Sequence, residues 1–172
     1  MLDNISICTI IKNMRTHNIP KLVFSIIMAH SAGIAGSFFT VAAIPVWYEG
    51  IIKPSFNPPS WVFGPVWLFL YTLIGVALYL IWQKKHGNKK VRFVFIFFIA
   101  HLVINALWSA VFFGLQNILL ALVVIVILWL MILSLIFMSW SIDKRASILL
   151  VPYFLWVSFA TVLNFSILQL NF

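Results

Sequence analysis

Five long runs of apolar residues, separated by short polar or proline-rich segments, make up most of the 172-residue chain. A bilayer core of roughly 30 Å requires about 20 apolar residues as helix, and each run meets that length. In lipid only a helix satisfies the backbone hydrogen bonds of such a run. The pattern predicts an all-α integral membrane protein, a single bundle of five transmembrane helices at about 22–44, 61–82, 93–114, 118–140 and 147–170.

The segments between these runs predict how the chain is organised. A basic, polar segment, 1–21, precedes a transmembrane domain over 22–172, and nothing in it resembles a cleavable signal peptide. The connection "GLQN" (114–117) is so short that the third and fourth spans must form an antiparallel hairpin. The stretch 47–67, which begins inside the loop 45–60, holds three tryptophans and four prolines, more large rings than a simple connection needs, and we expect the loop to act as a cover.

The composition supports a membrane protein. Hydrophobic residues make up 64% of the chain and charged residues 8%, whereas soluble domains carry about 25% charged residues. The single cysteine, Cys8, excludes an intramolecular disulfide and any metal site built from several cysteines.

Basic residues predict the orientation of the bundle. Ten of the eleven lysines and arginines lie in the N-terminal segment, the second loop and the fourth loop, and only Lys53 lies in the opposite loops. By the positive-inside rule the N-terminus is expected to be cytoplasmic, most simply in a bacterial cytoplasmic membrane. The net charge of +8 is then explained by topology and contact with anionic lipid. Nucleic-acid binding is a poor alternative, because the basic residues are scattered over three short segments that flank spans.

Polar and aromatic residues inside the spans form helical stripes. Intervals of three and four place residues on one helix face, and no Asp, Glu, Lys or Arg stands in mid-span. This absence weighs against a carrier built on an intramembrane carboxylate. The stripes are Trp67, Tyr71 and Gly75 on the second span, His101, Asn105, Trp108 and Phe112 on the third, and Trp156, Ala160 and Asn164 on the fifth.

At 1.5 Å per residue, these stripes reach similar depths in the outer half of the bundle. An apolar, aromatic-lined cavity with a few polar groups is the usual form of a small-molecule site, and the loop 45–60 would be its lid. Plain packing remains an alternative for Trp67, Trp108 and Trp156, and helix–helix hydrogen bonding remains one for Asn105 and Asn164. The small residues "SAGIAGS" (31–37) favour close helix approach, either within a protomer or across a dimer.

Three motifs carry a family resemblance. The stretch "WYEGIIKPSFNPPSWVFGPVWLFLY" (47–71) resembles the signature of the translocator protein family, also called the tryptophan-rich sensory protein or peripheral benzodiazepine receptor family. "NALWSAVFFG" (105–114) and "VPYFLWVSFATVLN" (151–164) match further family motifs in the expected order. The resemblance covers about residues 30–170 and points to a bacterial member.

The resemblance implies a five-helix membrane protein, often a homodimer, that binds tetrapyrroles such as protoporphyrin IX. It also implies benzodiazepine-type ligands and, less strongly, sterols. No further cofactor or metal is implied. Some bacterial relatives are reported to degrade protoporphyrin IX in light, and the tryptophans linked to that activity match Trp67 and Trp156; whether this chain is an enzyme stays open. By position, the ligand-binding residues would be Ser37, Tyr48, Trp67, Asn105, Trp108, Trp156, Ala160 and Asn164.

The chain departs from the family pattern at several positions. Phe56 replaces a tryptophan in the lid, and Val124 stands where many relatives carry an aspartate, which would remove a polar contact to the ligand. The C-terminal sterol-recognition pattern fails because Phe165 takes the tyrosine position; such patterns are weak evidence in any case.

Two other classes of function remain open. His30 and His101 lie at similar depths on the first and third spans, as bis-histidine haem ligation in a b-type electron carrier requires. Two buried histidines with local partners are the simpler interpretation. A structural or regulatory membrane partner with an empty cavity is the third hypothesis.

Overall fold

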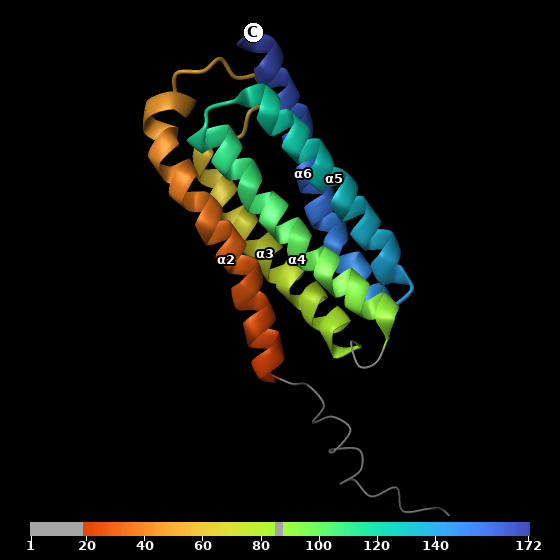
Figure 1. Cartoon of the computed structure of the whole chain (residues 1–172). Coiled ribbons are helices and arrows are strands. Elements are labelled where there is room, and N and C mark those ends of the chain that lie inside the picture. The colour runs from red at the N-terminus through yellow and green to blue at the C-terminus, as the bar shows by residue number, and fades with distance from the viewer. Residues whose placement is uncertain (1–18, 85–87) are drawn as a thin grey trace, which may run out of the picture.

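The computed structural model describes residues 19–84 and 88–172 as an up-and-down bundle of long helices (Figure 1). Five of these helices are long and apolar enough to cross a membrane, which confirms the predicted all-α membrane bundle. Lys12, Arg15, Lys85 and Cys8 lie outside the described residues. In chain order the elements are α2 (Ile19–Ala43), η1 (Ile44–Tyr48), α3 (Ser60–Gln83), α4 (Lys89–Ser109), η2 (Ala110–Gly114), α5 (Ile118–Trp140) and α6 (Lys144–Leu170).

Short polar side chains begin three of the helices. Asn88 accepts hydrogen bonds from the amides of Lys90 and Val91, Asn117 accepts one from Leu120, and Asp143 accepts one from Arg145. An oxygen at this position satisfies amides that have no partner inside the helix. Because of these caps, α4 and α6 begin three to four residues earlier than the apolar runs alone predicted.

The first span is longer than expected. After Ala43 the chain continues through the π-helical turn η1 to Tyr48, so the loop covers 49–59 rather than 45–60. The apolar run continues through Ile44–Tyr48, and Tyr48 is buried against Phe112. A second π-turn, η2, extends α4 to Gly114. Such turns are frequent at functional sites, and both lie at the same end of the bundle (Figure 1).

Close packing joins α2 to its neighbours within the protomer. A Cβ atom at Gly75 would lie 2.6 Å from the Cα of Ile26, and one at Gly33 would lie 2.3 Å from the Tyr71 ring. A Cβ at Gly36 would lie 3.0 Å from the Ser109 hydroxyl. These glycines therefore let α2 approach α3 and α4, and they supply the intraprotomer role predicted for the small residues.

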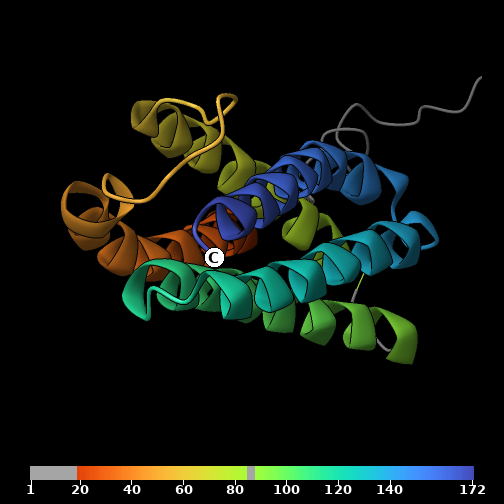
Figure 2. The same cartoon turned by 90° about the horizontal axis from the view of Figure 1, so that it is seen from above.

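The two ends of the bundle differ in packing and charge. Seen from above, α6 lies between α3 and α5 (Figure 2). Large side chains fill the end that holds the α3–α4 and α5–α6 connections, among them Phe98, Ile132 and Leu150. The basic residues described in these connections and at the start of α2 lie at this end, whereas Lys53 lies in the loop at the other (Figure 1). The latter end holds the cavity.

Candidate functional site

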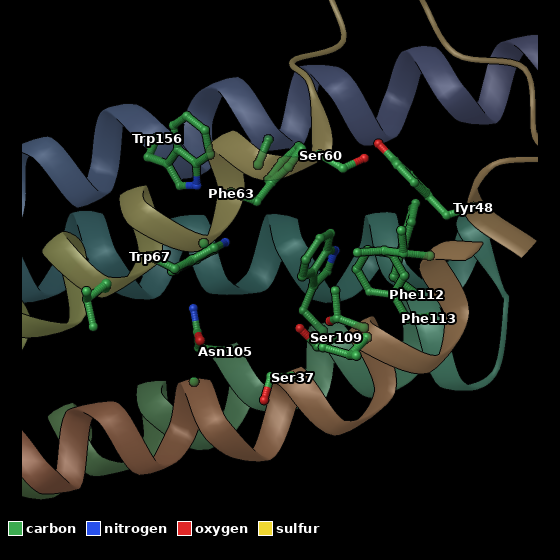
Figure 3. A pocket seen from close by; sticks show the side chains of 18 of the residues that line it. Ser37, Tyr48, Ser60, Phe63, Trp67, Asn105, Ser109, Phe112, Phe113 and Trp156 are labelled. Carbon is green, nitrogen blue, oxygen red and sulfur yellow. The ribbon is translucent and has the colours of Figure 1, made fainter. Parts of the chain in front are cut away.

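A cavity of about 480 Å³ lies inside the bundle, and its wall includes Tyr48 and Ser60, the two residues that flank the loop 49–59, hereafter the lid loop. Its volume lies within the range of roughly 300–1,000 Å³ typical of small-molecule sites. Helices α2, α3, α4 and α6 line it together with both π-turns (Figure 3). All eight residues predicted for the site lie in its wall: Ser37, Tyr48, Trp67, Asn105, Trp108, Trp156, Ala160 and Asn164.

Aromatic rings form most of the wall. Trp67 stacks on Tyr71 with ring centroids 5.2 Å apart, and Trp108 stacks on Phe112 at 5.3 Å. Trp156 meets the edge of Phe63 at 5.9 Å. Each indole is held by a neighbouring ring, and paired rings are worth about 0.5–1.5 kcal/mol beyond the area they bury. The result is a set of fixed, flat, apolar faces.

The two buried amides of the site hold the helices together. Asn105 accepts a hydrogen bond from the Tyr71 hydroxyl and donates one to the Tyr153 hydroxyl at 2.9 Å. Asn164 accepts from the Trp108 indole at 3.2 Å and donates to the Ile118 carbonyl at 3.1 Å. A ligand that bonds to these amides must use a remaining lone pair of the oxygen, use the second N–H of the nitrogen, or replace a protein partner.

Three hydrogen-bond donors in the cavity wall lack a protein acceptor among the described residues. The indole N–H groups of Trp67 and Trp156 and the hydroxyl of Ser109 have no hydrogen-bond partner among the described residues, although all three side chains line the cavity. They are therefore the groups most ready to bond a ligand acceptor. Sequence reasoning missed Ser109, yet its spacing of four from Asn105 places it on the same helix face. Phe63 was also missed, and it lies four residues before Trp67.

One side of the cavity is bounded by residues on the outer surface of the bundle. Ile34 and Val41 on α2 and Leu68 on α3 line the cavity while remaining 59%, 70% and 63% exposed. On α6, by contrast, Leu163, Asn164 and Ile167 are buried. The exposed rim is apolar and lies between α2 and α3, so a surrounding bilayer would cover it with acyl chains.

The two histidines considered for haem ligation have different surroundings. His30 lines the cavity, and its Nε2 lies 3.1 Å from the Thr72 hydroxyl. His101 is fully buried outside the cavity wall, with its Nδ1 2.8 Å from the Phe98 carbonyl and its ring against Tyr153. The rings do not face a common space that could hold a macrocycle. The geometry favours histidines with local partners.

Comparison with known proteins agrees with this architecture. The model of the TspO/MBR family matches residues 25–170. The chain belongs to the TspO/MBR family. It is 46% identical to the tryptophan-rich protein TspO of Archaeoglobus fulgidus over 155 residues, which cover 90% of this chain and 99% of that protein. It is 45% identical to the TspO protein of Chlorobaculum tepidum over 145 residues (82% and 89%), and 32% identical to the human translocator protein over 155 residues (89% and 90%).

The tryptophan-rich stretch of this TspO/MBR chain has a defined place in the fold. It runs from η1 through the lid loop into the first turns of α3, so one continuous segment carries the cavity residues Tyr48, Ser60 and Trp67. Phe56, the departure in the lid, meets Phe159 at 6.3 Å. Val124 lies in a buried apolar cluster with Phe112 and Leu163 and outside the cavity wall. The valine thus contributes to packing behind the wall.

Proposed function

We propose that this TspO/MBR protein binds tetrapyrroles such as protoporphyrin IX, and related flat apolar ligands, in the cavity beneath the lid loop. The observation that carries the proposal is the cavity with three indoles from three helices, Trp67, Trp108 and Trp156. A flat macrocycle buries large apolar area against such faces, and each Å² removed from water contributes ~25 cal/mol.

The charge of the wall suggests how a tetrapyrrole would be oriented. No Lys, Arg, Asp or Glu is among the described residues that line the cavity, and burying an unpaired carboxylate is strongly unfavourable. The carboxylates of protoporphyrin IX are therefore expected at the cavity mouth, with the ring inside. The lid carries Lys53, whose ammonium lies 4.9 Å from the ring centroid of the cavity residue Tyr48. This cation is placed to pair with a carboxylate at the mouth.

Light-dependent turnover is a further part of the proposal. The described wall contains no acid–base pair or activated nucleophile for hydrolysis, whereas it exposes the oxidisable indoles of Trp67 and Trp156. Turnover would be an oxidation of the excited porphyrin with O₂ as the oxidant. The roles of binder, sensor or carrier need no such step.

We also propose that the protein lies in the cytoplasmic membrane of a prokaryotic cell as a homodimer. The ten-to-one bias of basic residues supports the membrane and its orientation. The dimer rests on the family resemblance, and cross-linking in native membranes tests it.

A titration of the purified protein with protoporphyrin IX, first in the dark and then in light, tests the proposed ligand. Saturable quenching of tryptophan fluorescence with stable porphyrin bands in light would support a binder, sensor or carrier. Loss of the Soret band in light, beyond a protein-free control, would support an enzyme. Absence of saturable quenching would overturn tetrapyrrole binding and favour a structural or regulatory role.

A further inference from the structure

The end of α6 is hydrogen-bonded to the lid loop across 119 residues of sequence. The Asn171 Oδ1 accepts a hydrogen bond from the Ile52 amide at 2.9 Å, and the Asn171 Nδ2 donates one to the Ile52 carbonyl at 2.8 Å. The side-chain amide therefore pairs with both backbone groups of one lid residue. Figure 1 shows the lid crossing to this end of α6.

The position of Asn171 is set by the helix it ends. Its Nδ2 also donates to the Ile167 carbonyl at 2.8 Å, and its backbone amide bonds to the Leu168 carbonyl at 3.3 Å. These bonds satisfy carbonyls that the last turn of a helix leaves without partners. The side-chain amide that bonds to the lid is thus held in place by hydrogen bonds to the last turn of α6.

The lid has few other attachments to distant parts of the molecule. Among the described residues, one other hydrogen bond reaches the lid from the preceding helical turn: the Tyr48 hydroxyl donates to the Asn57 Oδ1 at 2.8 Å. The remaining hydrogen bonds of the lid join residues that are close in sequence. One ring contact, between Phe56 and Phe159, joins the lid to α6, and Ile51 packs against the buried cluster that includes Leu163 and Ile167. Asn171 therefore supplies the hydrogen bonds that hold the lid to the far side of the cavity.

The lid joins two edges of the cavity. It leaves η1 at Tyr48 and enters α3 at Ser60, and both residues line the cavity. Its Phe56 touches Phe159, which packs on the cavity residue Trp156 with ring centroids 5.6 Å apart. A lid released from α6 would uncover the cavity on its aqueous side.

We propose that Asn171 is a latch that holds the lid closed and limits access to the cavity from water. Asparagine suits this role because its side chain presents one donor and one acceptor in the geometry of a backbone amide. Both Asn171 and Ile52 are exposed, so water competes for these bonds and their net contribution is modest. The latch is therefore reversible. Asn171 follows directly after the region matched to the family, so the match assigns it no role.

Access to a cysteine inside the cavity tests the latch without any ligand. Cys8 is the single cysteine of the chain, so Cys8→Ser with Ser109→Cys leaves one thiol, in the cavity wall. In lipid nanodiscs, acyl chains cover the apolar side between α2 and α3, and a charged methanethiosulfonate reagent has to pass the lid. The measured quantity is the rate of thiol modification.

We expect Asn171→Ala to raise this rate about tenfold, the factor that corresponds to losing two exposed hydrogen bonds. Asn171→Asp should act alike, because a carboxylate cannot donate to the Ile52 and Ile167 carbonyls. Gln169→Ala is the matched control on the same exposed turn and should leave the rate unchanged. Rates within twofold of the parent for both Asn171 variants would overturn the latch. So would an equal acceleration by Gln169→Ala.

A second measurement tests the latch separately from the proposed function. The biological role of the latch rests on the proposed function, whereas its existence does not. If protoporphyrin IX binds, Asn171→Ala should speed both its association and its dissociation while changing the dissociation constant little. If the parent protein binds no porphyrin, the proposed ligand fails, and the modification rates still decide for or against the latch.

Discussion

The contact between Gly33 and Tyr71 links the packing of α2 to the shape of the cavity. A Cβ at position 33 would lie 2.3, 2.7 and 2.9 Å from three carbons of the Tyr71 ring. Carbon atoms in contact lie ~3.5–4.0 Å apart, so Gly33→Ala has to displace the ring or the helix by at least ~1 Å. The ring cannot retreat freely, because it stacks on Trp67 and its hydroxyl bonds to Asn105.

The expected loss of stability can be worked from these contacts. Overpacking costs ~1–3 kcal/mol, and a buried hydroxyl–amide bond left unmade costs a further ~1–3 kcal/mol. Replacing glycine by alanine in a helix returns up to ~1 kcal/mol. The net expectation for Gly33→Ala is a destabilisation of ~1–5 kcal/mol.

Gly64→Ala is a matched control, since Gly64 also lies in a helix and lines the cavity, yet nothing beyond its chain neighbours and its own helical backbone lies within 4 Å of its added Cβ. Equilibrium unfolding in mixed micelles would measure both variants against the parent. We expect Gly64→Ala to be neutral or slightly stabilising, and Gly33→Ala to be clearly destabilised with altered tryptophan fluorescence from Trp67. A Gly33→Ala variant as stable as Gly64→Ala would show that the Tyr71 ring accommodates the added methyl group without cost.

Three further predictions concern chemistry, charge and capping. Changing both Trp67 and Trp156 to Phe should suppress light-dependent loss of the Soret band while most dark binding remains; unchanged turnover would reject the indole role. Lys53→Gln should weaken dark binding of protoporphyrin IX several-fold and leave its dimethyl ester unaffected, and equal effects on both ligands would argue against carboxylate pairing. The hydrogen bond from the Arg145 side chain lowers the pKa of the Asp143 carboxyl below its ordinary value. A lowered folded-state pKa contributes stability that is present above the unfolded value, about 4, and is lost as pH falls through the folded value. Thermal unfolding measured from pH 7 to pH 3 should therefore show that the parent loses thermal stability below about pH 4. The loss should be smaller in Asp143→Asn, because the Asn side chain keeps the cap but does not titrate. At pH 7, Asp143→Ala should lower the free energy of unfolding by ~1 kcal/mol, because the cap is lost. Equal pH profiles for the parent and Asp143→Asn would contradict the link between Asp143 ionisation and stability.

Local patterns in the sequence were sufficient to predict the five spans and the helix faces that point inward. Hydropathy is a local property that a bilayer imposes on each run separately, so the spans could be found without any contact between them. Spacing at three and four residues placed Trp67, Asn105 and Trp156 on inward faces, because that period belongs to the helix itself. The eight residues predicted to lie together do line one cavity.

The hydrogen-bond partners of these residues depend on how the helices pack against one another. The bonds from Asn105 to Tyr71 and Tyr153 join three helices, and they depend on how far each helix turns and slides against the next. The approach of α2 depends on contacts such as that of Gly75 with Ile26, which no single-helix pattern contains. The bond from Asn171 to Ile52 likewise required both ends of the fold to be placed. Such contacts arise from packing between distant segments, so local pattern and depth predict the wall of the site but not the hydrogen bonds that close it.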